Sequence, residues 1–300
     1  MSSPEQIEEA LSVNLELWSA DPKADTKTQL ERQVIEVFLV ALGMTKSCGE
    51  KIFLKGGILI GAIYSSGRNT ADIDFSTVLE PSKDFPDKLR EELGEALPRA
   101  TAKLGMPEIL LDLQSVKFRP REDSFVEASY PAISAKFAYA ERGSPQEKSL
   151  LAGTCSQVLH ADISFNEPID FVQEVYIEGS EVRILAYSLI DLVAEKYRAI
   201  LQQKVRNRAR RQDVFDLDYL ISEKIIQGLD KTQLLSTFRR KCESRDIQPT
   251  KDSLDDPDVI ERSERDWATL ASEVEELPEF KQSYETVRDY YHSWPWNSGE

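Results

Sequence analysis

Cysteine and histidine are scarce in this chain, which narrows the chemistry that it can carry. The three cysteines, Cys48, Cys155 and Cys242, are odd in number, lie far apart and lack the short spacing of metal ligands. The sequence therefore predicts neither a disulfide framework nor a zinc site, and reduced structural thiols are expected. The two histidines, His160 and His292, have no plausible nucleophile near them in the sequence, so we expect structural roles for both.

Long hydrophobic runs are also missing. No stretch approaches the roughly 18 uninterrupted apolar residues of a membrane span, and the first residues, MSSPEQIEEALS, are acidic and amphipathic without the apolar region of a secretory signal. We therefore expect a cytoplasmic protein with no membrane association. Its 300 residues, 41% hydrophobic and 30% charged, are typical of an ordinary globular protein with one large or two moderate domains.

Positive charge is in deficit, because 37 basic side chains face 53 acidic ones and the formal net charge is −16. This balance argues against a nucleic-acid partner, whose phosphates are bound mainly by Lys and Arg. The distribution is uneven, however. Residues 196–211, KYRAILQQKVRNRARR, carry seven cations and no acid, and 239–241 form a weaker basic stretch. Two interpretations remain open: a solvated helical face or a local anion-binding surface.

The hydrophobic patterns predict an α+β fold in two parts. Apolar residues at helical spacing predict helices over 4–17, 28–42 and 83–104, and a short helical segment over 58–64. Strands are predicted at 52–54, 73–78, 109–118, 132–141, 156–165 and 183–185. From Ser188, which opens a capping-box-like start, the chain is predicted helical with a polar loop at 248–258. We expect an N-terminal α/β domain over 1–186 and a C-terminal helical domain over 187–300.

Two aspartates, Asp72 and Asp74, flank Ile73 in the second predicted strand. Because strand side chains alternate between faces, both carboxylates project from one side, about 7 Å apart along the chain. Like charges this close repel each other unless a cation lies between them, and oxygen ligands of this kind suit Mg²⁺. The alternative is a solvent-facing strand end, where acidic pairs are common.

The surroundings of this pair favour the metal interpretation. Gly56 and Gly57 lie between a strand and a helical segment, where the backbone can approach a ligand and a helix start offers N–H groups to an anion. A tight turn is the alternative for the two glycines. Arg68 and Thr70 add a cation and a hydroxyl just before the aspartates. Groups that bind phosphate and groups that bind metal therefore occur within twenty residues.

A two-metal site needs a third carboxylate, and two strands offer one. Asp162 in LHADISF is costly to bury unless it is paired or bound to a metal. Asp112 in ILLDL has a similar setting. We favour Asp162, partly because of the resemblance described next.

Five segments in this order, LKGG, RNTADIDF, HADIS, AEKYRAILQQ and RRQDVFDLDYL, resemble the AbiEii/AbiGii-type toxin family. This family is a branch of the DNA polymerase β-like nucleotidyltransferases found in bacterial abortive-infection and toxin–antitoxin systems. The resemblance runs from about Phe53 to Leu220, with a helical tail around Trp267. It implies a nucleotidyltransferase-like mixed sheet with flanking helices, followed by a C-terminal helical domain.

The resemblance also assigns roles to single residues. The glycine-rich motif falls on Gly56 and Gly57, the metal-binding acids on Asp72, Asp74 and Asp162, the third-motif lysine on Lys196, and the acidic fourth motif on Asp213, with Asp216 one helical turn later. Lys196 and Arg68 are expected to contact phosphates, and Asp213 to orient Lys196 or the nucleotide. Two departures stand out: Ile58 occupies the place where many nucleotidyltransferases carry a serine, and Gln212 separates Arg211 from Asp213.

The implied reaction transfers a nucleoside monophosphate from an NTP to an acceptor, with Mg²⁺ as cofactor. An RNA such as tRNA is the expected acceptor, guided by the basic run 196–211, and a cognate antitoxin is the expected protein partner. Two alternatives remain. One is an enzyme of the same fold that modifies a small molecule such as an aminoglycoside-type antibiotic. The other is a nucleotide-binding regulatory protein that has lost turnover, an alternative that Ile58 leaves open.

Overall fold

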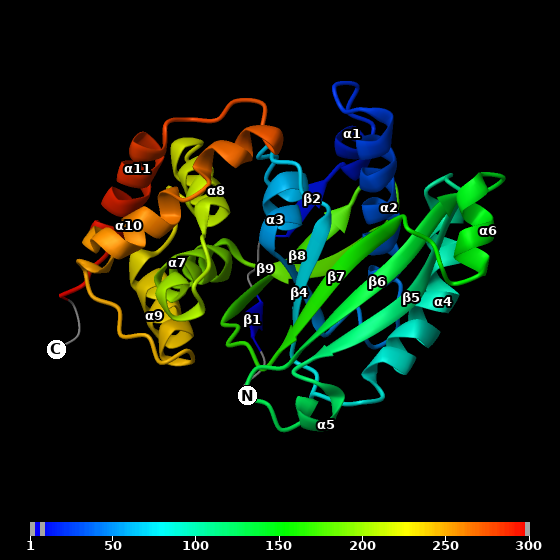
Figure 1. Cartoon of the computed structure of the whole chain (residues 1–300), viewed down its shortest axis with the longest axis horizontal. Helices are drawn as coiled ribbons and strands as arrows, with labels where there is room; N and C mark the ends of the chain where they lie inside the picture. Colours follow the sequence, from blue (N-terminus) through cyan, green and yellow to red (C-terminus); the bar gives the residue numbers. More distant parts are fainter. Residues whose placement is uncertain (1–3, 7–9, 298–300) are drawn as a thin grey trace. The chain divides into compact units, whose positions relative to one another are not determined.

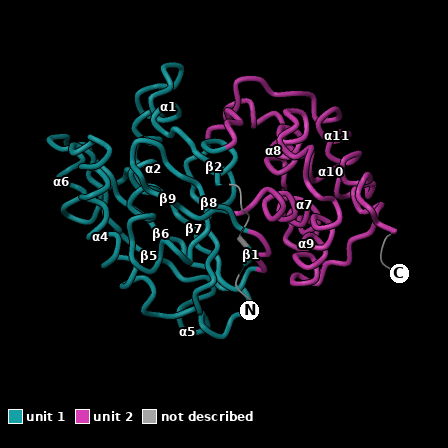
Figure 2. The backbone as a smooth tube through the Cα atoms, turned by 180° about the vertical axis from the view of Figure 1, so that it is seen from behind, with its two compact units in different colours: residues 1–63, 70–167, 172–186 teal, residues 64–69, 168–171, 187–300 magenta. Residues whose placement is uncertain are grey.

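The chain forms two compact units, seen in a computed structural model that describes residues 4–6 and 10–297 (Figure 1). The first unit consists of Met1–Ile63, Thr70–Glu167 and Val172–Ala186, and the second of Tyr64–Asn69, Pro168–Phe171 and Tyr187–Glu300 (Figure 2). The main segment of the second unit thus starts at Tyr187, and two short stretches from earlier in the chain join it.

The sheet and its helices occupy the first 187 residues. The strands are β1 (Glu5–Gln6), β2 (Leu11–Val13), β3 (Ile52–Lys55), β4 (Asp72–Thr77), β5 (Ile109–Arg119), β6 (Ala132–Glu141), β7 (Val158–Phe165), β8 (Phe171–Ile177) and β9 (Val182–Tyr187). The helices are α1 (Leu15–Ser19), α2 (Thr26–Gly43), α3 (Gly56–Ile58), which continues as the π-helical turn η1 (Leu59–Ile63), α4 (Phe85–Lys103), α5 (Glu122–Phe125) and α6 (Pro145–Leu151).

The described strands form one mixed sheet in the order β1-β8-β9-β3-β4-β7-β6-β5, with β2 beside β8. β4 runs parallel to β7, whereas β3 pairs with β4, β6 with β7, and β5 with β6 in the antiparallel sense. This mixed sheet with flanking helices confirms the fold class expected from the sequence.

One face of the sheet is apolar and lies against helices. Phe38 on α2 packs on Phe75 and Phe137, with ring centroids 6.1 Å and 4.7 Å away, and Phe85 on α4 packs on Phe165 at 5.2 Å. Each buried phenylalanine contributes about 1.5–3 kcal/mol by leaving water. Because strand side chains alternate, this packing commits the intervening residues of the same strands to the opposite face.

The second unit is helical. Its elements are α7 (Leu189–Arg206), α8 (Arg211–Ser222), α9 (Lys231–Glu243), the 3₁₀ turn η2 (Ser253–Asp255), α10 (Pro257–Glu264), the 3₁₀ turn η3 (Trp267–Ser272) and α11 (Phe280–His292). The Ser188 side chain caps α7 by accepting the N–H of Asp191, as the sequence predicts. Among the described helices, none is both long and apolar enough to cross a bilayer.

The expected helix over 4–17 is wrong for the described residues before Leu15. Leu11–Val13 form β2, which pairs in parallel with β8 through Leu11↔Val175 and Val13↔Ile177. α1 begins only after Asn14, whose side chain accepts the Leu17 N–H as an N-cap. Pairing with the sheet edge therefore overrides the helical periodicity of this segment, while residues 7–9 lie outside the described part of the chain.

We predict that Gly43→Ala lowers the free energy of unfolding by about 1–3 kcal/mol in urea titrations, because overpacking a close contact destabilises a fold. A Cβ at Gly43 would lie 2.5 Å from the backbone oxygen of Arg183 on β9. Gly94→Ala on α4 is the matched control, since a Cβ there meets nothing within 4 Å. Alanine should stabilise α4 by about 0.5–1 kcal/mol. Equal effects of the two substitutions would contradict tight packing of α2 on β9.

Candidate active site

Three aspartates share the polar face of the sheet. Asp72 and Asp74 lie on β4 and Asp162 on β7, and the parallel register pairs Asp74 with Asp162 and Asp72 with His160. Neighbouring strands are about 4.8 Å apart, and residues paired in register point to the same face. Asp72 is exposed, and the other two are half-buried. The backbone thus brings together acids that are far apart in the sequence.

Asp112, the alternative third acid, lies elsewhere on the sheet. Its register partner on β6 is Ala138, and the partner of Ala138 on β7 is Val158. Val158 precedes Asp162 by four residues, so Asp112 is displaced by about 13 Å along the strands and by two strand spacings across them. Of the two candidates, Asp162 is the one that adjoins Asp74.

Gly56 borders these acids directly. It follows β3, where Lys55 is the register partner of Asp74, and it has a positive φ of 72°. A Cβ at Gly56 would overlap the Asp74 carboxylate and lie 2.9 Å from the Asp74 Cβ. Glycine is therefore required by both backbone conformation and space. Gly57 and Ile58 follow as buried residues, so the Ile58 side chain belongs to the core.

A cation that the sequence analysis did not identify already neutralises one of the acids. The Arg119 guanidinium, from β5, lies 3.2 Å from each carboxylate oxygen of Asp162. Both side chains are partly exposed, at 51% and 36%. The alternation of Lys117 and Arg119 along β5 was visible in the sequence, but the approach to Asp162 depends on strand order, which local patterns do not reveal.

The acid set fits a hard divalent cation. Carboxylate oxygens from two adjacent strands are the ligands that Mg²⁺ accepts, and a partly open site leaves room for water and phosphate oxygens. Among the described residues, only Asp252, Asp255 and His292 of the second unit bring three ligand atoms within 4.8 Å of one another. The oxygens of Asp72, Asp74 and Asp162 are spread more widely, and Asp162 faces Arg119.

The fourth-motif residues form a buried charge cluster inside the second unit. The Lys196 Nζ, on α7, donates to Asp216 at 2.7 Å and to Asp213 at 3.1 Å, both on α8. Arg68 donates to the two Asp216 oxygens at 2.8 Å and 3.0 Å, and to Glu273 at 3.3 Å. Asp216 is fully buried.

The cations in this cluster outweigh the effect of burial on its carboxylates. Burial alone would raise the pKa of Asp216, but the Lys196 ammonium and the Arg68 guanidinium hold that pKa below its ordinary value. Burial would lower the pKa of Lys196, but Asp216 and Asp213 hold it above its ordinary value. Both groups are therefore charged at neutral pH, and Lys196 stays cationic.

The sequence-predicted phosphate contacts fall in different units. Thr70 is half-buried in the loop before β4 of the first unit, whereas the Arg68 guanidinium belongs to the second. Glu273, which binds both Arg68 and Gln212, was not identified from the sequence. It lies in the loop after η3, and nothing in the local pattern there indicates a partner so distant in the chain.

The basic run 196–211 is largely neutralised by acids of its own unit. Besides Lys196, three of its cations form ion pairs: Arg198 with Glu195, Lys204 with Asp256 and Asp258, and Arg210 with Asp213. The run therefore presents much less free positive charge than its sequence suggests.

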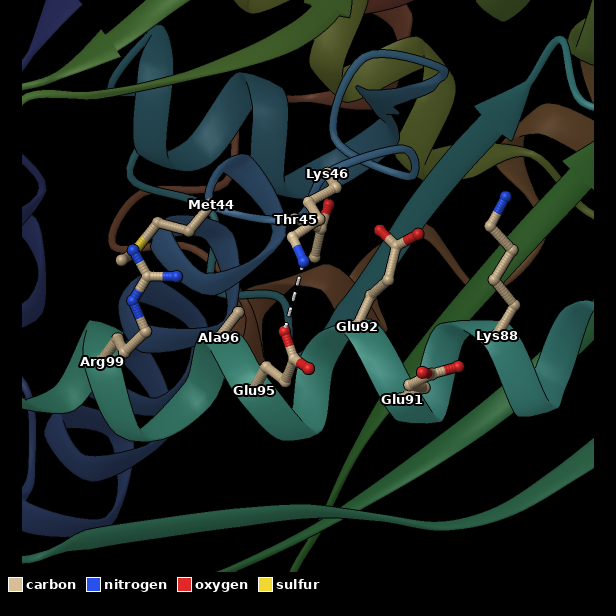
Figure 3. Close-up of a pocket in the computed structure, with 9 residues that line it drawn as sticks. All are labelled: Met44, Thr45, Lys46, Lys88, Glu91, Glu92, Glu95, Ala96 and Arg99. Carbon is tan, nitrogen blue, oxygen red and sulfur yellow. Dashed lines mark ion pairs between the residues drawn. The ribbon is translucent and has the colours of Figure 1, made fainter.

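A separate pocket of about 380 Å³ lies between the C-terminal end of α2 and one side of α4 (Figure 3). Its lining mixes both signs of charge, including the ion pair of Lys46 with Glu95 at 3.9 Å. Glu92 accepts the N–H groups of Ser47 and Cys48, at 3.0 Å and 3.1 Å, which fixes the loop after α2. These contacts give the pocket a structural role, and it contains none of the sequence-predicted site residues.

We predict that Asp216→Asn lowers the free energy of unfolding by about 3–5 kcal/mol near neutral pH, because it leaves two buried cations short of a carboxylate. Since the native pKa of Asp216 is depressed, its contribution is present above the ordinary aspartate pKa of about 3.9. The contribution is lost as the pH falls through the native value, so the gap between wild type and variant should shrink in acid. Urea titrations at several pH values measure this.

Glu95→Gln is the control for a carboxylate that is not buried. The side chains of Glu95 and Lys46 are 65% and 86% exposed, so the change should stay within about 0.5 kcal/mol. A loss for Asp216→Asn no larger than this would contradict the buried network.

Comparisons with known proteins identify the family of this chain and its fold. A family model described as nucleotidyl transferase AbiEii toxin, type IV toxin–antitoxin system, matches residues 38–291. The chain is similar in fold to JHP933 from Helicobacter pylori, with a TM-score of 0.53 and 16% identity, over 89% of this chain and 93% of that one. It is also similar to MenT4, a nucleotidyltransferase toxin from Mycobacterium tuberculosis, with a TM-score of 0.53 and 14% identity, over 96% and 91% of the two chains. No curated protein sequence matches the chain.

Proposed function

The chain belongs to the AbiEii family of nucleotidyl transferase toxins of type IV toxin–antitoxin systems, and we propose that it transfers a nucleoside monophosphate from an NTP to an RNA hydroxyl. A tRNA is the first acceptor to test. The observation that carries this proposal is the register of β4 and β7, which sets Asp74 against Asp162 beside the Gly56 turn. Acids that share a face next to an exposed backbone suit phosphoryl transfer, which depends on positioning and charge stabilisation.

Asp72, Asp74 and Asp162 are the residues that we propose to hold Mg²⁺. The ion, when bound, supplies positive charge that offsets the developing charge on the triphosphate. Gly56 and Gly57 allow the β and γ phosphates to approach the backbone, and the Thr70 hydroxyl can donate to them. Asp162 is the proposed acceptor of the proton that the attacking hydroxyl releases.

Two residues of the second unit, Lys196 and Arg68, are proposed as nucleotide contacts on the strength of the family motif. Lys196 and Arg68 are cationic, and Asp213 orients the Lys196 ammonium through their 3.1 Å hydrogen bond. Asp216 neutralises both cations and thereby holds them in place. These assignments concern the charge and orientation of each side chain within its own unit.

A cognate antitoxin is the proposed protein partner, as expected for a type IV toxin–antitoxin family. We propose the cytoplasm as the site of action, because NTPs and RNA are found there. The buried Ile58 supports a second candidate function, a nucleotide-binding protein with little turnover, since no side-chain hydroxyl stands at that position of the glycine motif.

The decisive assay incubates the purified protein with each radiolabelled NTP, Mg²⁺, and either total tRNA or small acceptors such as aminoglycosides. We expect label in RNA. Label on a small acceptor would point to the antibiotic-modifying alternative, and NTP binding without transfer would point to the regulatory alternative.

We predict that Asp162→Asn and Asp74→Asn each lower the rate of transfer by about 10²–10⁴-fold, because each removes a charge from the reacting centre. Asp112→Asn is the matched control, an equal change on the same sheet but away from the acids, and it should retain wild-type transfer. Circular dichroism checks that all three variants are folded. Loss of activity in Asp112→Asn with retention in Asp162→Asn would reverse the assignment of the third acid.

We predict that Arg119→Gln tightens Mn²⁺ or Mg²⁺ binding a few-fold in titration calorimetry without nucleotide. The guanidinium competes with the metal for the Asp162 carboxylate, and a pair this exposed is worth at most about 1 kcal/mol. Unchanged or weaker metal binding would contradict competition between the two cations.

A further inference from the structure

The polar face of the sheet places cations beside the acids. Two rows of register partners cross it from β4 to β5: Asp72, His160, Lys136 and Ser115, and Asp74, Asp162, Ser134 and Lys117. The acids occupy β4 and β7, and the lysines occupy β6 and β5. Because register partners share a face, Lys117 and Lys136 point to the same side of the sheet as the acid set.

Both lysines are free to meet a ligand. Each is exposed, and neither forms an ion pair with any described residue. The nearest face positions on β5 and β6 are Ser115, Ala132 and Ser134, which are small and uncharged. Farther along the same face lie Arg119, which is paired with Asp162, and the exposed Asp112, which is the register partner of Ala138. In a chain of net charge −16, two unpaired lysines whose nearest neighbours on the face are small and uncharged make a local positive strip.

The strip differs from the basic run 196–211 because its cations have no carboxylate partners among the described residues. In the run, Arg198, Lys204 and Arg210 are paired with carboxylates of their own unit. A cation that is already paired must break that pair before it can bind a phosphate. Lys117 and Lys136 can bind a phosphate without first breaking an ion pair.

We propose that Lys117 and Lys136 bind the phosphate backbone of the RNA acceptor and direct its terminal hydroxyl toward Asp162. This inference rests on the proposed transfer to RNA and names the surface that holds the acceptor. Lys117 lies two strand spacings from Asp162, about 10 Å, and Lys136 lies at the same separation from Asp72. A ligand that reaches from the acids to both lysines has several negative charges in a row, as a single strand of nucleic acid does.

The positive charge of the strip also distinguishes between the possible acceptors. A small acceptor such as an aminoglycoside is itself cationic and would be repelled by the strip. A single-stranded RNA end can lay successive phosphates over a flat, polar sheet face while its last hydroxyl stays beside the acids.

The salt dependence of RNA binding tests this surface. Binding of a short fluorescein-labelled single-stranded RNA is measured by anisotropy over a range of salt concentrations. For single strands the slope of log K against log salt is about −0.7 per neutralised phosphate. The double variant Lys117→Gln/Lys136→Gln should therefore reduce the magnitude of the slope by about 1.4 and weaken binding on the order of tenfold at low salt.

The control is Lys83→Gln/Lys148→Gln, which removes the same charge from the residues before α4 and from α6, off the sheet face. Its RNA slope should match that of the wild type. In the lysine-strip variant, NTP affinity and kcat at saturating RNA should stay at wild-type levels, while the KM for RNA rises. An unchanged slope in the strip variant, or an equal fall in the control, overturns the inference.

The two proposals can fail separately. RNA labelling by the wild type with no dependence on Lys117 and Lys136 keeps the proposed function and overturns the acceptor surface. Lysine-dependent RNA binding without nucleotide transfer to any acceptor keeps the surface and overturns the proposed function. Displacement of the RNA by an acidic peptide at equal charge would show a protein-binding face and also overturns the inference.

Discussion

The parallel pairing of β4 with β7 is the constraint on which the site depends. Ile73, Phe75 and Ile163 must be buried under the helices, and a slip of one residue in the register would turn them to the open face. The same alternation forces Asp74 and Asp162 outward and side by side. Hydrophobic burial on one face therefore holds the two carboxylates together on the other face. They repel each other unless a cation lies close to them. In the structure, Arg119 is a cation that pairs with Asp162.

In the second unit, by contrast, the charged motif residues are buried and paired. Arg68 and Lys196 are enclosed with Asp216, and each of these three charges has a partner of opposite sign. Such a network fixes the relative positions of α7, α8 and the 64–69 segment and holds both cations in place. The open sheet face instead leaves charges of both signs accessible, the acids on one side and the lysines on the other.

The sequence predicted the parts of the fold that depend on local pattern. β5, β6 and β7 follow from alternation, α2 and α4 from helical spacing, and the start of α7 from Ser188. What it missed depends on partners distant in the chain. β2 forms because β8 offers an edge at that place, and β8 itself has no clear alternation to mark it. The contact of Arg119 with Asp162 requires the order of three strands, and Glu273 reaches Arg68 only after the helical unit has folded.

The overall acidity of the chain does not oppose a local site for RNA. At physiological salt the Debye length is about 8 Å, so an exposed charge acts mainly on its neighbours. Lys117 and Lys136 lie on adjacent strands within about that distance of each other, whereas most of the 53 acidic side chains are farther away and screened. The basic run shows the converse, because four of its seven cations have acids in contact, which weakens their effect on a distant phosphate. The position of the unpaired cations therefore determines where RNA binds. The net negative charge of the chain disfavours RNA binding on the rest of the surface.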